Sequence, residues 1–397
     1  MKIVIIGTGV AGSVISDMLQ SKGFEVVLLE KESSPGGMCK SYYKQGFTYE
    51  YGPHILAIHN CSQKSANYLR SKIETVETQL TSGSFVNGQL TYYPPSIFSA
   101  EKINLKYLVE KEILNLPKTP DETNFESYLI SKVGKTLYGL FFYSFTKKFW
   151  KIEPRLLSSE WAKIRHLGED IMTKKMFFNK KWCAYPKKDW NELFYNLLKN
   201  KNVLYDIEVK KVDFKEKYVL IQNGNRIKYD FLISTMHIDE LFGYSRGKLD
   251  YAGYSIRPEI IDRKHFAMLD ETPIAMTYYP DLGVPHCRVS DYGSFQKKTD
   301  YPYDNRTIVT FETPDTSCRF YPFTDEKNEL KFKEYLNLAS QEDSVLSFGR
   351  MGLYKYLTSD TTVEMAFRAM DYISNWSNLA ANNRLKAYSN IRGDWKN

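Results

Sequence analysis

A glycine-rich loop follows an apolar run in the segment KIVIIGTGVAG, residues 2–12. The apolar residues 2–6 predict a short buried strand, and the loop Gly7-Thr8-Gly9-Val10-Ala11-Gly12 has the form G-x-G-x-x-G. Residues 13–22 follow with the pattern of a helix that ends at Gly23, and residues 25–30 predict a second strand. This succession of strand, loop, helix and strand is typical of a Rossmann-type dinucleotide-binding unit.

Each glycine of the loop has a mechanical role in such a unit. Gly7 makes the tight turn, Gly9 lets the backbone approach a pyrophosphate, and Gly12 lets the helix pack closely on the strand. The N-terminus of the helix then faces the phosphates. Glu30, at the end of the second strand, is placed to accept hydrogen bonds from ribose hydroxyls. The alternative is a tight β-α turn that binds no ligand.

A second glycine pair bears on the choice of cofactor. After Glu30 the chain reads Lys31-Glu32-Ser33-Ser34-Pro35-Gly36-Gly37. This segment resembles the extended signature of the glutathione-reductase-like flavoproteins, in which the second loop lies along the cofactor. The resemblance favours FAD over NAD.

Bulk composition limits the classes of function. The 397 residues carry a net charge of +7 that is spread thinly, which argues against nucleic-acid binding and suits a small anionic substrate. No apolar run reaches the roughly 18 residues of a membrane span. The five cysteines include no C-x-x-C pair, so neither a zinc site nor a disulfide framework is indicated. A reduced, cytoplasmic setting is therefore expected.

The middle of the chain changes from helical to strand-like patterns. Residues 105–161 are mostly helical in pattern. Residues 202–233 alternate, with a hairpin signal at Asn223-Gly224. Within that stretch, residues 218–221 and 231–234 predict strands that rejoin the first sheet.

The last hundred residues carry two further signals. Residues 307–311 predict a strand from their β-branched content. Thr358 or Asp360 is expected to cap a final helix that runs through Ser374.

The segment Tyr51-Gly52-Pro53-His54-Ile55 resembles the tyrosine-glycine-X-histidine segment found beside the flavin in the UDP-galactopyranose mutase family. Similar segments follow in the family's order along the chain. They are Asn87-Gly88-Gln89-Leu90 with Tyr93-Pro94, residues 133–150 ending in Trp150, Arg288 after Val284-Pro285-His286-Cys287, Glu312-Thr313-Pro314, Phe320-Tyr321-Pro322, Phe348-Gly349-Arg350 and Tyr354-Lys355-Tyr356. The ordered set carries the resemblance, rather than any single piece.

The resemblance implies an α/β fold. It consists of a glutathione-reductase-like FAD-binding domain of Rossmann type, an inserted helical domain and an antiparallel sheet domain. The FAD-binding domain is expected to be discontinuous, over residues 1–75, 195–245 and 335–397. The helical domain is expected over residues 100–170. The sheet domain, which binds the substrate, is expected over residues 76–99, 171–194 and 246–334.

The resemblance also implies a reaction. The family interconverts the pyranose and furanose forms of a nucleotide-sugar, with UDP-galactose as the default substrate and polysaccharide biosynthesis as the setting. Reduced flavin attacks the anomeric carbon through N5, the nucleoside diphosphate leaves, and the flavin–sugar adduct opens and recloses in the other ring form. The FAD must be reduced, but no net reductant is consumed. Arginines suit the doubly charged leaving group because guanidinium grips phosphate bidentately.

Carrying the motifs over residue by residue defines the candidate site. The candidate catalytic residues are Arg288, Arg350 and His54. The candidate substrate-binding residues are Trp150, Lys181, Tyr185, Trp190, Tyr321 and Tyr356. The candidate cofactor-binding residues are Gly7, Gly9, Val10, Ala11, Gly12, Glu30, Lys31, Gly37, Met38, His54, Ile55, Gly349, Arg350 and Thr358. No metal site is expected.

The chain departs from the family mainly on the substrate side. Ala57 replaces a second histidine, and Lys181 or Lys180 stands where the family has a diphosphate-side arginine. Trp190 lies near a lost glycine pair, and Thr358 replaces an aspartate but can still cap a helix. The chemistry is therefore expected to be kept, while the base or sugar recognised could have changed.

Two other classes of function share the fingerprint. One is an FAD-dependent oxidoreductase of the amine-oxidase or desaturase type, which would reduce its flavin with substrate and pass electrons to an acceptor. The other is a non-catalytic scaffold stabilised by flavin, which would show no turnover. The sequence leaves the nucleotide base, the sugar, the physiological reductant and a homodimer open.

Overall fold

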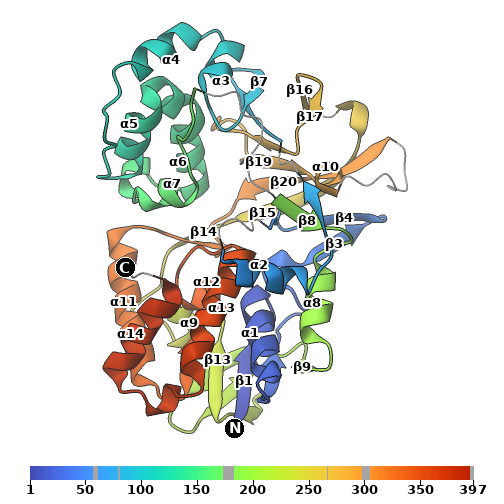
Figure 1. Cartoon of the computed structure of the whole chain (residues 1–397), viewed down its shortest axis with the longest axis vertical. Coiled ribbons are helices and arrows are strands. Elements are labelled where there is room, and N and C mark those ends of the chain that lie inside the picture. Colours follow the sequence, from blue (N-terminus) through green and yellow to red (C-terminus); the bar gives the residue numbers. More distant parts are fainter. Residues whose placement is uncertain (57–60, 79–80, 173–182, 266, 297–304, 394–397) are drawn as a thin grey trace.

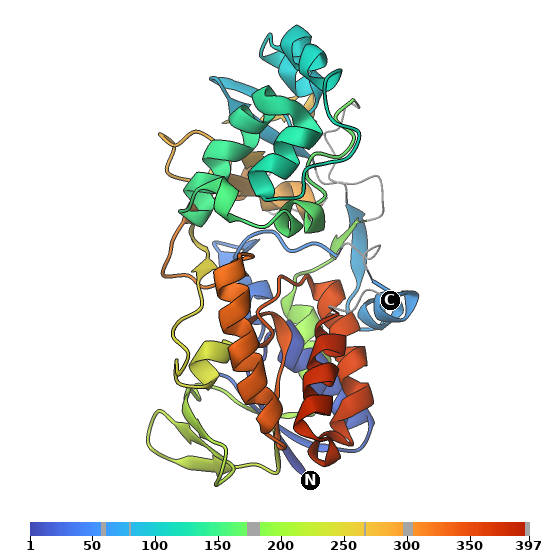
Figure 2. The same cartoon turned by 90° about the vertical axis from the view of Figure 1, so that its left-hand side faces the viewer.

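The structure is a computed structural model of the 397-residue chain. It describes residues 1–56, 61–78, 81–172, 183–265, 267–296 and 305–393. Figure 1 shows a Rossmann-type half that contains the N-terminus, a β-sheet above it, and a group of helices at the opposite end of the molecule. The turned view shows the same order of layers (Figure 2).

A five-stranded parallel sheet forms the centre of the Rossmann-type half. Its strands run in the order β22-β13-β1-β2-β9. Their bounds are β1 Lys2–Ile6, β2 Glu25–Leu29, β9 Asn202–Leu204, β13 Phe231–Ser234 and β22 Val345–Ser347. Ile3 and Ile5 of β1 face one layer of the core, and Val4 and Ile6 face the other. This two-residue alternation explains why the strand is apolar throughout, since both faces of the sheet are covered.

Helices cover one face of this sheet, and a small antiparallel sheet covers the other. The helices packed on the first face include α1 (Val10–Ser21), α8 (Asn191–Leu198), α13 (Ser359–Ile373) and α14 (Ala381–Arg392). The other face contacts β10 (Val209–Asp213) and β11 (Tyr218–Ile221), which pair with β12 (Arg226–Lys228). The neighbouring helix α11 (Glu326–Gln341) packs against α14.

The structure confirms most of the predicted β-α-β unit and corrects one strand. Helix α1 begins at Val10, three residues earlier than predicted, because Gly9 already serves as its N-cap. Residues 231–234 rejoin the first sheet as β13, as predicted. Residues 218–221 form the predicted strand, but it does not rejoin the first sheet, because β11 pairs with β10 and β12 in the separate sheet. The hairpin at Asn223-Gly224 explains this, since it favours pairing with the adjacent strand.

A six-stranded sheet forms the second layer. Its order is β15-β20-β19-β18-β6-β7, antiparallel throughout except for the parallel pair β18 and β6. The bounds are β6 Ser82–Val86, β7 Gln89–Tyr92, β15 Tyr254–Asp262, β18 Met276–Tyr278, β19 Arg288–Asp291 and β20 Arg306–Pro314. The predicted strand at residues 307–311 lies within β20. Short pairs surround this sheet: β3 (Ser41–Lys44) with β4 (Phe47–Glu50), β5 (Thr75–Thr78) with β8 (Cys183–Pro186), β14 (Tyr251–Ala252) with β21 (Tyr321–Pro322), and β16 (Met268–Leu269) with β17 (Thr272–Pro273).

Helices pack over the six-stranded sheet, and most of them lie in residues 105–161, where the sequence predicted helical structure. They are α3 (Ile97–Lys102), α4 (Lys106–Ile113), α5 (Phe125–Leu137), the π-helix η3 (Tyr138–Tyr143), α6 (Ser144–Trp150) and α7 (Glu160–Ile164). Their apolar side chains share one core with Met276, Tyr278 and Ile308 of the sheet. The limits of the three predicted domains stay predictions.

Helix α13 begins as the sequence predicted. Thr358 is its N-cap and forms a capping box with Thr361, which satisfies N–H groups that the first helical turn leaves open. The short helix α12 (Gly349–Gly352) precedes it. Three further α-helices are α2 (Gln63–Arg70), α9 (Ile238–Leu241) and α10 (Tyr292–Gln296). None of the helices in the described part of the chain is long and apolar enough to cross a membrane.

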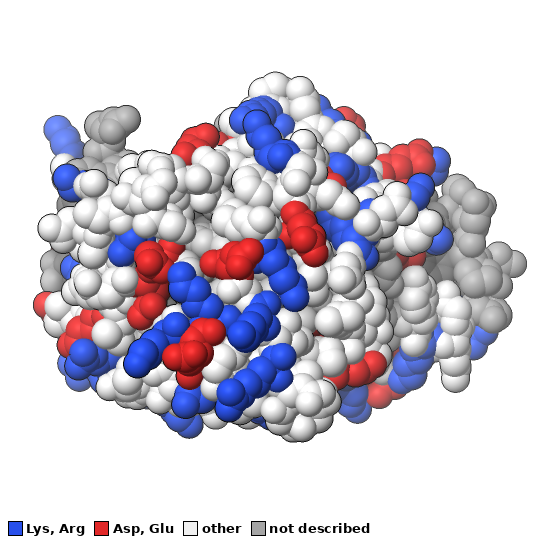
Figure 3. All heavy atoms as spheres, turned by 90° about the horizontal axis from the view of Figure 1, so that it is seen from below, with Lys and Arg blue, Asp and Glu red and all other residues white. Residues whose placement is uncertain are grey.

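Charged side chains of both signs are interspersed on the face seen from below, without one uniform basic patch (Figure 3). This mixture agrees with the thin spread of positive charge in the sequence.

Candidate functional site

One cavity of about 820 Å³ runs from the glycine loops of the Rossmann-type half to the six-stranded sheet and the helices above it. It contains most of the predicted site residues. Its walls include Gly7, Gly9, Val10, Ala11, Glu30, Lys31, Gly37, Met38, His54, Ile55, Trp150, Arg288, Tyr321, Arg350, Tyr356 and Thr358. The fold therefore brings together motifs that lie up to 351 positions apart in sequence, from Gly7 to Thr358.

Two glycines of the first loop are required by steric contacts within the chain. Gly7 has a φ of +93°, and a Cβ there would lie 2.3 Å from Oγ1 of Thr235. A Cβ on Gly12 would lie 1.9 Å from the carbonyl oxygen of Gly7. The structure therefore supports the turn and packing roles predicted for Gly7 and Gly12, and Gly12 acts from outside the cavity wall.

Gly9 differs from its neighbours because the chain itself leaves its Cβ position open. The nearest atom to a Cβ on Gly9 would be Cα of Gly37, at 4.0 Å. The second glycine loop lies alongside the first, since Gly36 donates its N–H to the carbonyl of Thr8 at 3.0 Å. Gly9 occupies the N-cap position of α1, but it has no side chain to accept hydrogen bonds from the helix N–H groups. An uncapped helix terminus facing an open cradle fits the pyrophosphate of a bound dinucleotide.

Glu30 has a structural role in addition to the predicted one. Its Oε2 accepts hydrogen bonds from the backbone N–H of Thr8 at 2.8 Å and from the Thr8 hydroxyl at 2.6 Å. Its Oε1 accepts the N–H of Glu32 at 3.0 Å. Glu30 thus holds the glycine loop against the end of β2 while its carboxylate lines the cavity. Each carboxylate oxygen can accept two hydrogen bonds, so Oε1 keeps capacity for a ribose hydroxyl.

Arg288 lies at the sheet side of the cavity in a buried ion pair. Its Nη2 donates to Oε2 of Glu312 at 2.6 Å, and its Nε lies 2.9 Å from Oε1 of the same residue. Ser290 donates to Oε1 of Glu312 at 2.9 Å. The side chains of Arg288 and Glu312 are 15% and 1% exposed. The carboxylate therefore fixes the guanidinium in one orientation beside the cavity.

Arg350 and Arg165 converge on two stacked tyrosines. The rings of Tyr321 and Tyr356 stack with centroids 5.7 Å apart. Arg350 lies over both rings, and its Nε donates to the carbonyl of Leu357 at 3.1 Å. Nη1 of Arg165 donates to the Tyr356 hydroxyl at 3.1 Å. Burial raises the pKa of Tyr356, but the positive charges of Arg165 and Arg350 outweigh it and hold this pKa below its ordinary value.

His54 lies at the cofactor side of the cavity between Cys39 and Glu50. Its Nδ1 is 3.2 Å from Oε2 of Glu50. Burial opposes the charged imidazole, but Cys39 and Glu50 outweigh it and raise the pKa of His54 to about 10. Likewise, burial raises the pKa of the Cys39 thiol, but the neighbouring His54 more than offsets this and lowers it. These groups form one polar cluster at the cofactor side of the cavity.

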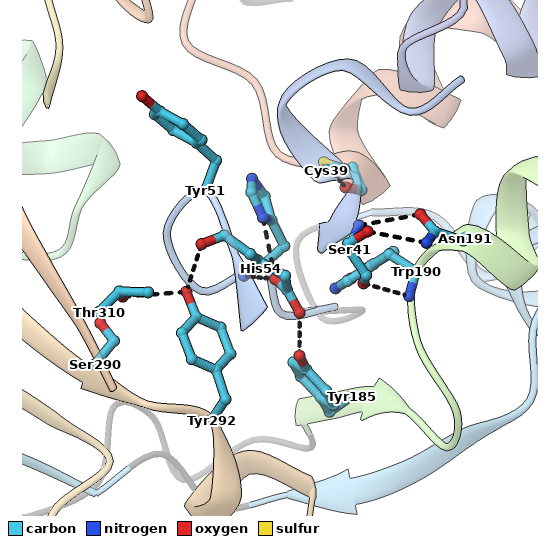
Figure 4. Close-up of polar contacts among 12 residues, drawn as sticks. Cys39, Ser41, Tyr51, His54, Tyr185, Trp190, Asn191, Ser290, Tyr292 and Thr310 are labelled. Atoms are coloured by element: carbon cyan, nitrogen blue, oxygen red, sulfur yellow. Dashed lines mark hydrogen bonds and ion pairs between the residues drawn. The ribbon is translucent and has the colours of Figure 1, made fainter. Parts of the chain in front are cut away.

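Two predicted substrate-binding residues lie in the core and not on the cavity wall. Tyr185 is fully buried and donates its hydroxyl to Glu50. Trp190 is fully buried, packs edge-on against the His54 ring and belongs to the core of the Rossmann-type half. Neither residue lines the cavity, so the structure does not support the predicted direct contact with substrate. Figure 4 shows Tyr185 and Trp190 on two sides of His54.

Trp150 touches the cavity but is only 2% exposed and packs against Trp161 and Phe323, so core packing accounts for most of its surface. Gly349 lies outside the cavity wall, and a Cβ there would lie 2.6 Å from Cβ of Ala11, so it permits a close approach to α1. Lys181, with the departure at Ala57, lies outside the described residues.

Several cavity residues were missed by the sequence reasoning. Thr235, Met236 and His237 follow β13 and line the cavity. The rule that ligands bind at the carboxyl ends of parallel strands could have found them. Arg165, Cys39 and Glu312 also line the cavity. No local pattern marks Arg165, since it ends a five-residue helix far from any recognised motif.

Lys148 holds the loop that leads to Arg288. Its Nζ donates to the carbonyls of Tyr279 and Asp281, at 2.5 and 2.6 Å. It also lies 2.9 Å from the carbonyl of Val284 and 3.0 Å from that of His286. Lys148 is 6% exposed and lies on α6, so one buried ammonium joins the helical layer to the β18–β19 connection.

Comparison with known protein families gives two matches. The family model described as UDP-galactopyranose mutase matches residues 140–356, more than half of the chain. The model described as an NAD(P)-binding Rossmann-like domain matches residues 5–71. In the part of the chain that the structure describes, no group of three His, Cys, Asp or Glu side chains is placed to hold a metal ion.

Similar proteins agree with the family match over nearly the whole chain. A probable UDP-galactopyranose mutase of Klebsiella pneumoniae is 24% identical over 95% of this chain and 96% of its own length. A dTDP-fucopyranose mutase of Escherichia coli is 24% identical over 94% of this chain and 99% of its own. A crystal structure of reduced UDP-galactopyranose mutase shares the fold, with a TM-score of 0.78 and 18% identity over 99% of this chain and 97% of its own. The fold, the joined motifs and the family match lead to one conclusion: the chain belongs to the UDP-galactopyranose mutase family.

Proposed function

We propose that this protein is an FAD-dependent mutase that interconverts the pyranose and furanose forms of a nucleotide-sugar. The observation that carries the proposal is the single cavity that joins the two glycine loops to Arg165, Arg288 and Arg350. One end has the features of a dinucleotide site, and the other concentrates fixed positive charge. A cofactor and an anionic substrate would therefore meet in one enclosed space.

The cofactor end supports FAD binding through features already described. The open cradle at Gly9 and the uncapped start of α1 would take the pyrophosphate, and Glu30 would accept from the ribose. The second glycine loop at Gly37 and the His54 segment would lie along the remainder of the cofactor. When bound and reduced, the flavin would supply the nucleophile that attacks the sugar.

The cationic end supports binding of a nucleoside diphosphate. The guanidinium groups of Arg288 and Arg350 are each held by an acceptor of the chain, so their orientations are set before a ligand arrives. The hydroxyls of Tyr321 and Tyr356 add donors beside them. Preorganised donors stabilise charge that develops on a leaving group, since they need no reorganisation during the reaction. These residues would hold the diphosphate as it departs and until it returns.

The sugar and the base follow from the relatives and are part of the proposal. UDP-galactose is the first substrate to test, and a dTDP-6-deoxyhexose is the second, because one similar protein carries the name dTDP-fucopyranose mutase. Lys181 stands where the family has an arginine, and Trp190 lies in the core. Both departures agree with altered contacts on the substrate side.

The test is a turnover assay with dithionite-reduced, FAD-loaded protein and a panel of UDP- and dTDP-hexoses. The expected result is a furanose product, identified by the NMR signal of its anomeric proton, that forms only with reduced protein and without net loss of reductant. Reduction of the oxidised flavin by a substrate, with electrons passed to an acceptor, would instead identify an oxidoreductase. No product with any nucleotide-sugar, despite normal FAD content, would reject the mutase proposal.

A further inference from the structure

The carboxylate of Glu50 lies directly behind His54 and is fully buried. It stands at the end of β4, where the chain turns into the His54 segment. Its Oε2 accepts the backbone N–H of His54 at 2.9 Å and lies 3.2 Å from Nδ1 of the same residue. Tyr185 donates its hydroxyl to the other oxygen, Oε1. Both carboxylate oxygens are therefore engaged.

The backbone around Glu50 is held as firmly as its side chain. The hydroxyl of Tyr292 donates to the Glu50 carbonyl at 3.0 Å. Tyr254 donates to the carbonyl of Tyr51 at 2.9 Å. Figure 4 shows His54, Tyr185 and Tyr292 gathered around this segment from separate elements. The distance between the carboxylate and the imidazole is thus set by the fold and not by a flexible loop.

This geometry constrains the hydrogen on the imidazole. An ionised carboxylate only accepts hydrogen bonds, so a ring nitrogen 3.2 Å away has to carry hydrogen to make a favourable contact. The other nitrogen, Nε2, is then the ring nitrogen that does not contact Glu50. The His54 side chain keeps 16% of its surface exposed and lines the cavity. Because Glu50 is fully buried, the exposed part of the imidazole lies away from the atom that contacts it.

The charges around His54 support the same arrangement. Cys39 approaches from the second glycine loop, Glu50 from β4, and Tyr356 and Arg350 from the region before α13. Burial raises the pKa of the Glu50 carboxyl, and the hydrogen bonds from His54 and Tyr185 work against that rise. A buried carboxylate needs a compensating partner, and the imidazole is placed to be that partner.

We propose that Glu50 is a positioning residue for His54: its carboxylate keeps a hydrogen on Nδ1 and turns the Nε2 edge toward the cofactor part of the cavity. The inference rests on the proposed function, since it assigns that edge to a bound flavin. The competing explanation is that Glu50 merely joins the β3–β4 hairpin to Tyr185, with no influence on the imidazole.

The test measures the protonation of the His54 imidazole directly. Protein labelled with ¹⁵N-histidine and loaded with oxidised FAD is followed by long-range ¹H–¹⁵N NMR between about pH 6 and 9, around the ordinary histidine pKa. His54 is identified among the six histidines by the signals lost in His54→Asn. The expected result is an Nδ1 that stays protonated over the whole range. A bare Nδ1 in the wild-type protein would overturn the proposal without any Glu50 variant.

Glu50→Gln provides the second arm, because it keeps the shape and removes the charge. The expected result is that His54 loses its second proton within the same pH range and that the midpoint potential of the bound flavin shifts downward. Asp291→Asn is the matched control, since Asp291 is another buried carboxylate, bonded to Ser294 and Thr307 and not to a histidine. It should leave the His54 signals unchanged. Identical His54 signals in wild type and Glu50→Gln would overturn the proposal.

These readouts separate the inference from the proposed function. If no nucleotide-sugar turns over, the mutase proposal fails while the state of Nδ1 is still measured. If the purified protein binds no FAD, the assignment of the Nε2 edge fails with it, and the link between Glu50 and Nδ1 can still be read in the cofactor-free protein.

Discussion

Arg350 lies over the ring of Tyr356, with its guanidinium carbon 5.0 Å from the ring centroid. Arg165 contacts the hydroxyl of the same ring at 3.1 Å. Two cations separated by 185 positions in the sequence thus share one aromatic partner in the cavity. The tyrosine thus holds two positive charges at one part of the cavity wall, where they would attract an anionic ligand.

Arg350→Ala should lower turnover about 100- to 1000-fold with normal FAD content, because losing an aimed donor typically costs about 2.7–4 kcal/mol of barrier. Arg350→Lys should recover only part of the rate, since it restores charge without the planar fork. Turnover and the affinity for free nucleoside diphosphate are the measurements. Arg257→Ala, at an exposed side chain of β15, is the control. Normal turnover in Arg350→Ala would place the diphosphate elsewhere.

Arg288→Ala should lose stability as well as turnover, in contrast to Arg350→Ala. It would leave Glu312 buried and unpaired, and breaking a buried ion pair costs about 3–5 kcal/mol. The double variant Arg288→Gln with Glu312→Gln should regain much of the stability but none of the turnover. Urea unfolding and the turnover assay separate these effects. A stable Arg288→Ala protein would mean that Glu312 finds another partner.

Gly9→Val and Gly12→Val should fail in different ways. The nearest atom to a Cβ on Gly9 would be Cα of Gly37 at 4.0 Å, so the fold should persist while FAD is lost. A side chain at Gly12 would lie 1.9 Å from the Gly7 carbonyl oxygen, so the fold itself should be destabilised. Flavin absorbance and circular dichroism of the cofactor-free protein report the two outcomes. Full flavin occupancy in Gly9→Val would refute the assignment of the pyrophosphate site.

Lys148→Met should destabilise the protein and weaken nucleoside diphosphate binding. Four carbonyls in a partly buried loop would lose their shared donor, and an acceptor left without a partner or water costs about 1–3 kcal/mol. The loop that leads to Arg288 would then be free to move away from α6.

Lys147→Met is the matched control for Lys148→Met, since Lys147 is adjacent, half-exposed and paired with Glu153 at the surface. It should change the melting temperature and the diphosphate affinity little. Equal effects of the two variants would show that the carbonyl cluster around Lys148 contributes nothing specific.

Features that depend on neighbouring residues were predictable from the sequence. The glycine loop follows from the sterics of a tight turn between a strand and a helix, and the structure places Gly7 at a φ of +93°. Thr358 caps α13 because its hydroxyl reaches the backbone three residues ahead. The error at residues 218–221 arose because strand propensity predicts a strand but not its partner.

The sequence by itself determined the dinucleotide-binding unit, the family resemblance and the arginines at positions 288 and 350 as site candidates. Only the tertiary structure showed that Arg165 lines the same cavity as these arginines and that Glu312 orients Arg288. It also showed that Tyr185 donates its hydroxyl to Glu50 and does not line the cavity. These relations connect side chains that are 24 to 191 positions apart. Their distances depend on how the sheet, the helices and the Rossmann-type half pack, and no local pattern of residues encodes that packing.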